Sequence, residues 1–159
     1  MSYHIYTTKG IVLGAWPLRE ADRTYSILTR DLGLVRASAS GVRKEESKLR
    51  GALEPFVLSS VSLVRGKEYW RITSAETLRP IPAEAGIGRP LALLEKLVQG
   101  EAAHPELFDA VETHLFSDEW RLVAHILYHL GYLKEEDLGL DKAELIKAIN
   151  SGLHQSQLA

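Results

Sequence analysis

Four basic side chains lie within eight consecutive positions, and they are the part of the chain best suited to bind an anion. The stretch SGVRKEESKLRGALEPF, residues 40–56, contains Arg43, Lys44, Lys48 and Arg50. Lysine and arginine bind the phosphates of a nucleic-acid backbone and release the counterions condensed on it. The stretch therefore predicts a phosphate-binding surface, to which the strand residues Arg36 and Arg71 would contribute. Glu45 and Glu46 leave a merely solvated surface helix as the alternative.

Aromatic side chains accompany the basic ones in the first half of the chain, and unpaired bases stack on such rings. Tyr69 and Trp70 are adjacent in a predicted strand, so their side chains point to opposite faces and at most one is fully interior. The other is the best candidate for stacking with a base. The further basic and aromatic residues of this half include Arg19, Arg23, Arg30, Arg65, Lys67, Tyr3, Tyr6, Trp16, Tyr25 and Phe56.

Two histidines of the second half, His125 and His129, have the i, i+4 spacing that places two zinc ligands on one helix face. A third ligand would come from His114 or Asp118. However, Asp118, Arg121 and both histidines follow the polar side of the predicted helix, which favours solvated or partly packed histidines. We therefore predict no metal site and no cofactor.

Motifs of the common enzyme classes do not occur in the sequence. The acidic clusters 45–46, 118–119 and 135–137 consist of adjacent carboxylates, which point in different directions and not into one cleft. The sequence has no GxxxxGK[ST] loop, no GxGxxG and no GxSxG. It also has no cysteine, which excludes disulfides, thiolate zinc sites and cysteine nucleophiles. We predict that the protein is not an enzyme and has no small-molecule substrate.

The first half has the alternation and the β-branched and aromatic residues of strands. The pattern predicts a strand over 3–16, two strands within 23–41 joined by a turn at 31–33, about two helical turns over 47–54, and a hairpin over 56–66 and 68–78. Three strands, a short helix and two strands are the order of a five-stranded OB barrel. The strand count leaves a half-open SH3-like barrel as the alternative.

The second half changes to a helical period after a segment rich in proline and glycine, residues 78–90. Four short amphipathic helices are expected, with the start signals Pro90, Pro105, Ser117 or Asp118, and Asp141 followed by Glu144. The fold class is thus α+β. We predict an OB-fold nucleic-acid-binding domain over residues 1–80 and a small all-helical domain over residues 81–159.

Charge is divided unevenly within the 159 residues. Residues 1–80 carry 13 Lys and Arg against 8 Asp and Glu, a net +5, whereas residues 81–159 carry a net −7. This division predicts two surfaces with different partners. The longest uncharged and mostly apolar stretch, LVAHILYHLGYL, has 12 residues against the roughly 20 that span a bilayer, and the N-terminus has no signal-peptide pattern. We predict a cytoplasmic protein that does not bind membranes.

Several motifs of the first half together resemble one protein family. They are Gly10-Ile11-Val12-Leu13, Glu20 and Asp22, Leu28-Thr29 followed by Gly33, Gly41-x-Arg43, Ser47, Gly51-x-Leu53-x-Pro55-Phe56, and the Ser-x-Glu pattern in ITSAETL, residues 72–78. Over residues 8–80 the sequence resembles the N-terminal domain of RecO, the bacterial recombination-mediator and strand-annealing protein.

The resemblance implies an OB barrel followed by a helical domain, with no catalytic residues. It implies binding of single- and double-stranded DNA, annealing of complementary strands in recombinational repair, and partnership with RecR and with single-strand-binding protein in support of RecA loading. Many relatives carry a four-cysteine zinc module in the helical half. This chain has no cysteine, so we expect a shortened form without that module.

Two alternatives stay open at the level of sequence. The first is a protein–protein adaptor of the recombination machinery that has little DNA binding of its own, favoured by the modest +5 of residues 1–80. The second, and less favoured, is a metal-dependent enzyme built on His125 and His129.

Overall fold

A computed structural model describes residues 4–40, 49–80, 87–98 and 100–155, which belong to two compact units. The first unit combines residues 1–81 with residues 98–104, and the second combines residues 82–97 with residues 105–159. Residues 98–104 thus fold with the first unit although they follow a helix of the second. The sequence predicted a single boundary between residues 80 and 81 and did not predict that residues 98–104 fold with the barrel.

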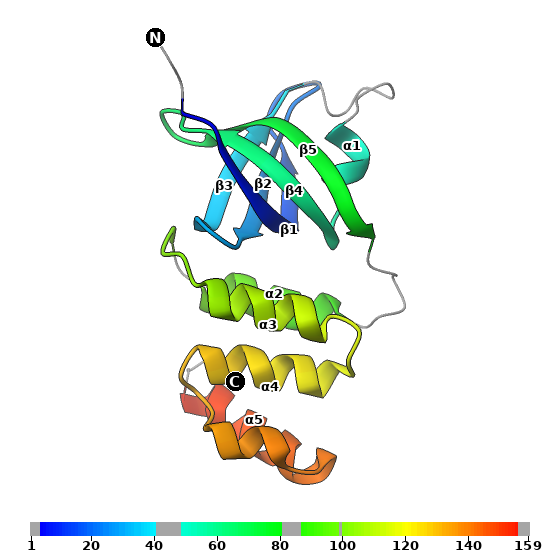
Figure 1. The fold of residues 1–159 in the computed structure, drawn as a ribbon, viewed down its shortest axis with the longest axis vertical. Coiled ribbons are helices and arrows are strands. Elements are labelled where there is room, and N and C mark those ends of the chain that lie inside the picture. Colours follow the sequence, from blue (N-terminus) through cyan, green and yellow to red (C-terminus); the bar gives the residue numbers. More distant parts are fainter. Residues whose placement is uncertain (1–3, 41–48, 81–86, 99, 156–159) are drawn as a thin grey trace. The chain divides into compact units, whose positions relative to one another are not determined.

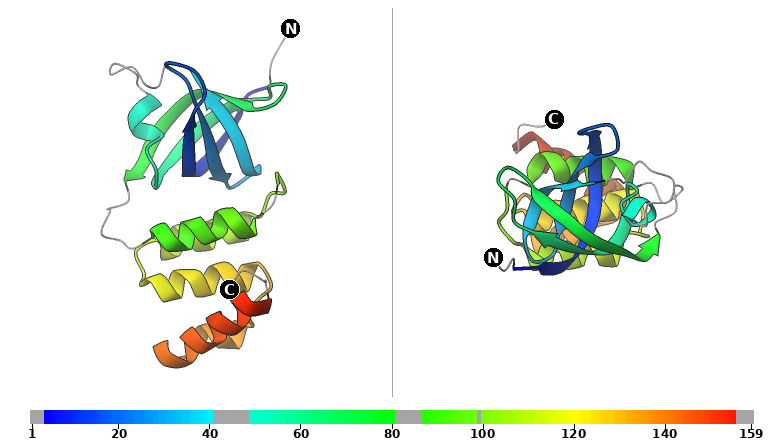
Figure 2. Two further views of the ribbon diagram at one scale, coloured as in Figure 1. Left: turned by 180° about the vertical axis from the view of Figure 1, so that it is seen from behind. Right: turned by 90° about the horizontal axis from the view of Figure 1, so that it is seen from above.

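The first unit is a closed barrel of five strands (Figure 1). The strands and the short helix are β1 (Tyr6–Pro17), β2 (Arg23–Thr29), β3 (Gly33–Ala39), α1 (Leu49–Ala52), β4 (Val57–Val64) and β5 (Trp70–Pro80). Their order around the barrel is β1-β2-β3-β5-β4, and β1 also pairs with β4. The β3–β5 pair is parallel and the others are antiparallel. This is the OB topology that the element order predicted, and Figure 2 shows it from two further directions.

The first strand closes the barrel because it pairs with a different neighbour at each end. The two pairings overlap at Gly10 and Ile11, and Gly10 lies opposite Thr29 of β2 and Ser59 of β4. A side chain there would not fit, since a Cβ atom on Gly10 would lie 2.8 Å from Cγ2 of Ile27. The register of the pairing between β1 and β2 then shifts by one residue of β1 between Val12 and Gly14. A glycine-associated bulge in this strand, expected from the sequence, is confirmed.

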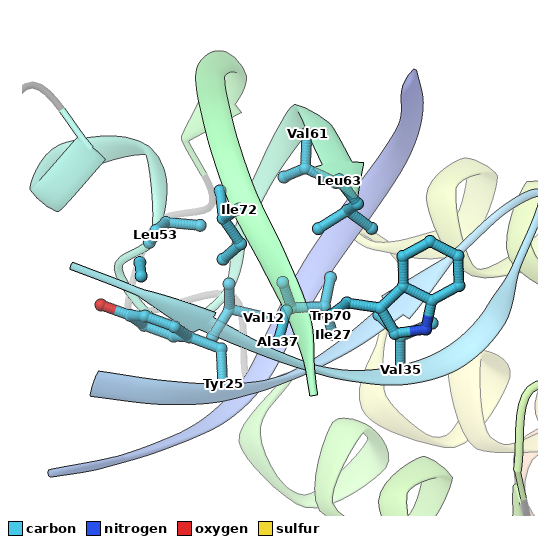
Figure 3. Close-up of a cluster of buried hydrophobic side chains, with 11 residues drawn as sticks. Val12, Tyr25, Ile27, Val35, Ala37, Leu53, Val61, Leu63, Trp70 and Ile72 are labelled. Carbon is cyan, nitrogen blue, oxygen red and sulfur yellow. The ribbon is translucent and has the colours of Figure 1, made fainter. Parts of the chain in front are cut away.

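The interior of the barrel is filled by alternate residues of the strands and by one side chain from the end of α1 (Figure 3). The buried cluster comprises Val12, Tyr25, Ile27, Val35, Ala37, Ala39, Leu53, Val61, Leu63, Trp70 and Ile72. Leu53, directly after α1, points into this cluster and is 2% exposed. Within the described residues α1 is one turn, shorter than expected. The chain then turns through Pro55 and Phe56, and the positive φ of 66° at Phe56 lies outside the helical region.

The second unit consists of helices. They are α2 (Gly88–Leu97), α3 (Pro105–His114), α4 (Glu119–His129), the 3₁₀ helix η2 (Glu135–Gly139) and α5 (Lys142–Gln155). Those other than α3 contribute to a common apolar cluster. Two predicted start signals are confirmed, because Asp118 accepts a hydrogen bond from the backbone nitrogen of Arg121 at 3.0 Å and Asp141 from that of Glu144 at 2.9 Å. None of the helices that the structure describes is long and apolar enough to cross a membrane.

One helix begins earlier than its sequence predicted. The expectation that Pro90 is the first residue of its helix is wrong, since α2 begins at Gly88. Pro90 lies in the first turn, where backbone N–H groups have no partner within the helix, so the missing N–H costs nothing there.

Candidate nucleic-acid interface

Polar and aromatic residues of neighbouring strands form a row from β1 to β5, in which Trp16 and Arg71 are exposed at the two ends and Thr24 between them is buried. Trp16 is opposite Thr24, Thr24 is opposite Ser38, and Ser38 is opposite Arg71. Arg36 stands two residues before Ser38 on the same face of β3, and its guanidinium carbon lies 5.2 Å from the centroid of the Trp16 ring. Arg36 and Arg71 are exposed, as their predicted role requires.

A groove of about 860 Å³ lies at one end of this row. Its walls come from the β1–β2 connection, the end of β3, the β4–β5 connection and the start of β5, and its lining residues are Leu18, Arg19, Asp22, Ser38, Ser40, Arg65, Gly66, Lys67, Glu68, Tyr69 and Arg71. Four cations and two carboxylates are among them, so the groove carries a net positive charge. The β1–β2 and β4–β5 loops of OB barrels flank the surface that binds oligonucleotides. The groove therefore occupies the place where this fold binds its ligands.

The four cations of the groove differ in their partners. Nη1 of Arg19 is 3.8 Å from Oδ2 of Asp22, and Nη1 of Arg65 is 3.1 Å from Oε2 of Glu101. The structure pairs neither Lys67 nor Arg71 with a carboxylate of the described residues. These two exposed charges are the most accessible to a phosphate, because nothing described has to be displaced from them.

The structure separates the two aromatic residues that the sequence nominated. Trp70 is 4% exposed and lies in the barrel core beside Val35 (Figure 3). Its Nε1 donates a hydrogen bond to Glu101, and the guanidinium carbon of Arg65 lies 4.3 Å from its ring centroid. The prediction that Trp70 could stack with a base is therefore wrong, because its ring is buried. Tyr69, half-buried in the groove, is the member of the pair that keeps this role as a proposal.

The basic stretch of residues 43–50 does not contribute to the groove as far as the structure describes it. Arg50 is exposed beside a different cavity of about 530 Å³, which Arg23, Tyr25 and Glu54 also line. Burial raises the pKa of Tyr25 there, partly opposed by the nearby Arg23. Arg43, Lys44 and Lys48 lie outside the described residues, and their phosphate-binding role stays a prediction.

Sequence reasoning named Arg19, Arg65, Lys67 and Trp16 among the basic and aromatic residues of the first half but did not assign them to the site. The first three lie in the loops that flank the groove, and the Trp16 side chain is 39% exposed on the neighbouring strand. A usable signal was present, because the predicted strand order already placed these loops beside the OB ligand surface.

The histidines of the helical unit form a pair of stacked rings. His114 at the end of α3 and His125 on α4 have ring centroids 3.6 Å apart and ring planes inclined by 13°. Burial lowers the pKa of His125 to about 4, with a smaller contribution from the charge of His114, and burial also lowers the pKa of His114. Among the residues that the structure describes, no group of three or more His, Cys, Asp or Glu is arranged to hold a metal ion.

Comparison with known proteins gives the family of the chain. Residues 1–81, half of the sequence, match the family model described as Recombination protein O N terminal. The chain belongs to the RecO family. The DNA repair protein RecO of Synechococcus sp. (strain JA-2-3B'a(2-13)) is 38% identical over 157 residues, which cover 82% of this chain and 54% of that protein.

Other RecO relatives give a similar picture. The DNA repair protein RecO of Gloeothece citriformis (strain PCC 7424) is 35% identical over 79% of this chain and 47% of its own length. That of Desulforudis audaxviator (strain MP104C) is 46% identical over 49% of this chain and 31% of its own length. The chain spans about half the length of the first two RecO relatives. Each of these relatives is named as a DNA repair protein.

Proposed function

We propose that the protein is a DNA-binding recombination mediator that binds single- and double-stranded DNA through the groove and anneals complementary strands. The observation that carries the proposal is the convergence of Arg19, Arg65, Lys67 and Arg71 with Tyr69 in one groove of an OB barrel. These residues come from two segments of the chain, the β1–β2 connection with Arg19 and residues 65–71 with the other four. The fold brings Arg19 to the basic and aromatic residues of the second segment.

The arrangement supports binding by contact alone. Lys67 and Arg71 would hold successive phosphates, and the backbone would continue along the outer face toward Arg36. Tyr69 and the exposed ring of Trp16 would stack unpaired bases, each contributing about 1–3 kcal/mol. Annealing follows if the charge of two strands is neutralised while their base edges stay free to pair. Duplex DNA would use the phosphate contacts without the stacking.

Salt-dependent binding of an oligonucleotide tests this proposal. Fluorescence anisotropy with a labelled 20-nucleotide dT strand, at several NaCl concentrations, compares wild type with Lys67→Ala/Arg71→Ala. Two lost phosphate contacts should reduce the slope of log K against log [salt] by about 1.4 for a single strand. The matched control is Lys96→Ala/Lys142→Ala, which removes two exposed charges from the helical unit and should leave both affinity and slope unchanged.

Three results would contradict the proposal. They are absent binding by wild type, binding that does not depend on salt, and an equal loss in the groove variant and in the control. Annealing is tested separately by mixing complementary labelled strands and following their pairing with and without the protein.

Partnership with RecR and with single-strand-binding protein is part of the same proposal and rests on family membership alone. An adaptor without DNA binding of its own is the second candidate, favoured by the carboxylates of Asp22 and Glu68 that offset part of the charge of the groove. A pull-down with RecR and single-strand-binding protein, run with and without nuclease, distinguishes the two. An adaptor keeps its partners after nuclease treatment and shows no salt-dependent anisotropy with dT.

A further inference from the structure

One cation of the groove is bound by a carboxylate from a distant part of the sequence. Glu101, in the connection between α2 and α3, accepts a hydrogen bond from Nη1 of Arg65 at 3.1 Å through Oε2. Its other oxygen accepts one from Nε1 of Trp70 at 2.9 Å. The Arg65 guanidinium also lies over the Trp70 ring, 4.3 Å from the centroid. Arg65 is thus held between an acidic group and an aromatic face.

The backbone around Glu101 is fixed to the barrel, so the position of the carboxylate is built into the fold. The backbone nitrogen of Leu34 donates to the carbonyl oxygen of Gly100 at 3.2 Å. Gly33 approaches the same segment so closely that a Cβ atom on it would lie 2.6 Å from the carbonyl oxygen of Ala102. Residues 98–104 belong to the barrel unit for this reason.

We propose that Glu101 is an internal counterion of Arg65 that lowers the affinity of the groove for phosphate. The inference rests on the proposed DNA binding of the groove. In the free protein Glu101 neutralises Arg65, and a DNA phosphate has to take the guanidinium from it. The exchange is accessible because the two side chains are 64% and 40% exposed. Glu101 does not move toward the DNA with Arg65, since the indole N–H of Trp70 still holds its second oxygen in the barrel.

The pair therefore divides the cations of the groove into two kinds. Lys67 and Arg71, which have no described carboxylate partner, give a full increment of affinity and of salt dependence. Arg65 adds less affinity and less salt dependence, because its contact with phosphate replaces its ion pair with Glu101. DNA binding is kept weaker than the number of basic residues in the groove indicates, which suits a protein that must release annealed strands.

Glu101→Gln tests the proposal with the full chain and a labelled 20-nucleotide dT strand. Glutamine keeps the size of the side chain and an oxygen that can accept from Trp70, but it removes the charge. Affinity at 100 mM NaCl should rise about two- to fivefold, the range that corresponds to an exposed ion pair. The slope of log K against log [salt] should become steeper by about 0.7, one single-strand phosphate contact.

A double-mutant cycle shows whether Glu101 acts through Arg65. The gain from Glu101→Gln should vanish in an Arg65→Ala background. The control Glu68→Gln removes a carboxylate of the same groove that has no described contact with Arg65, and its effect should be equal in both backgrounds. A gain from Glu101→Gln that persists without Arg65 would show a general charge effect and overturn the inference. An unchanged or reduced affinity would also overturn it.

A second variant approaches the pair from the other side and does not depend on the folding of Glu101→Gln. Arg65→Gln removes a cation that is already neutralised, so it should weaken dT binding several-fold less than Arg71→Gln does. Equal losses would refute the counterion. If wild type binds dT in a salt-dependent way and these variants do not differ, the counterion fails and the proposed function stands. If wild type does not bind dT, the proposed function fails first.

Discussion

The close approach of Gly33 to residues 98–104 predicts a large loss of stability for Gly33→Ala. Gly33 has φ of 76°, a conformation that costs an L-residue about 1–2 kcal/mol. The new Cβ would also meet backbone atoms of Glu101 and Ala102 at 2.6–2.8 Å, which no side-chain rotation relieves. Displacing this segment weakens the Leu34–Gly100 hydrogen bond, worth about 0.5–1.5 kcal/mol, and the Trp70–Glu101 bond to a charged group, worth about 1.5–3 kcal/mol.

The total expected loss is therefore about 3–6 kcal/mol, and one glycine of the same segment supplies a matched control. Gly100 has nearly the same backbone conformation, φ of 72°, but a Cβ on it meets nothing within 4 Å. Gly100→Ala should cost about 1–2 kcal/mol, the conformational part alone. The difference between the two variants, about 2–4 kcal/mol, measures the packing of the segment against the barrel.

Urea unfolding followed by tryptophan fluorescence measures both variants, because Trp16 and Trp70 both belong to the barrel unit. The midpoint for Gly33→Ala should fall well below that for Gly100→Ala at an unchanged m-value. Free energies of unfolding that agree within about 0.5 kcal/mol, or a larger loss for Gly100→Ala, would refute the reasoning that residues 98–104 are an integral part of the barrel.

Three further predictions concern the helical unit, and urea titrations check each of them. The pKa of His125 is lowered to about 4, so the unfolded chain binds the proton more tightly. The free energy of unfolding should therefore fall by about 1–2 kcal/mol as the pH decreases from about 6.5 toward 4, after allowance for the partial exposure of the ring. His125→Gln should flatten this pH dependence. An equally steep pH profile in the variant would contradict the prediction. Arg121 donates from Nη1 and Nη2 to the carbonyl oxygens of Leu138 and Leu140, both at 2.9 Å, so Arg121→Gln should cost about 2–4 kcal/mol; a loss below about 1 kcal/mol would show that these bonds contribute little. Asp118→Ala removes the N-terminal cap of α4 and should cost about 1 kcal/mol, which Asp118→Ser should largely restore.

The strands and helix starts could be predicted from the sequence because they depend on local rules. Alternation of apolar residues gave the strands, and the short side-chain oxygens of Asp118 and Asp141 gave two helix starts. The buried member of the Tyr69–Trp70 pair could not be chosen in this way. Adjacency puts the two on opposite faces, but the inner face is decided by the pairing of Trp70 with Ala37 of β3, a contact between distant segments.

The candidate site was harder to predict, because density of charge along the chain is not density in space. The basic run of residues 43–50 attracted attention for its local composition, yet its described member Arg50 lies beside a different cavity from the groove. Arg19 and Lys67 are 48 positions apart in sequence and meet only because the barrel closes. Glu101 carries no local signal at all, since its partners Arg65 and Trp70 precede it by more than thirty residues.

The interleaving of the two units has a consequence for how the chain is made. The chain leaves the barrel after residue 81, builds α2, and then returns with residues 98–104 before the remaining helices follow. During synthesis the barrel lacks its last segment until residue 104 has emerged from the ribosome, so its completion has to wait for a helix of the other unit. For the same reason no single cut of the chain yields both units whole, and an excised fragment that ends at residue 81 would lack the partner of the Trp70 indole N–H.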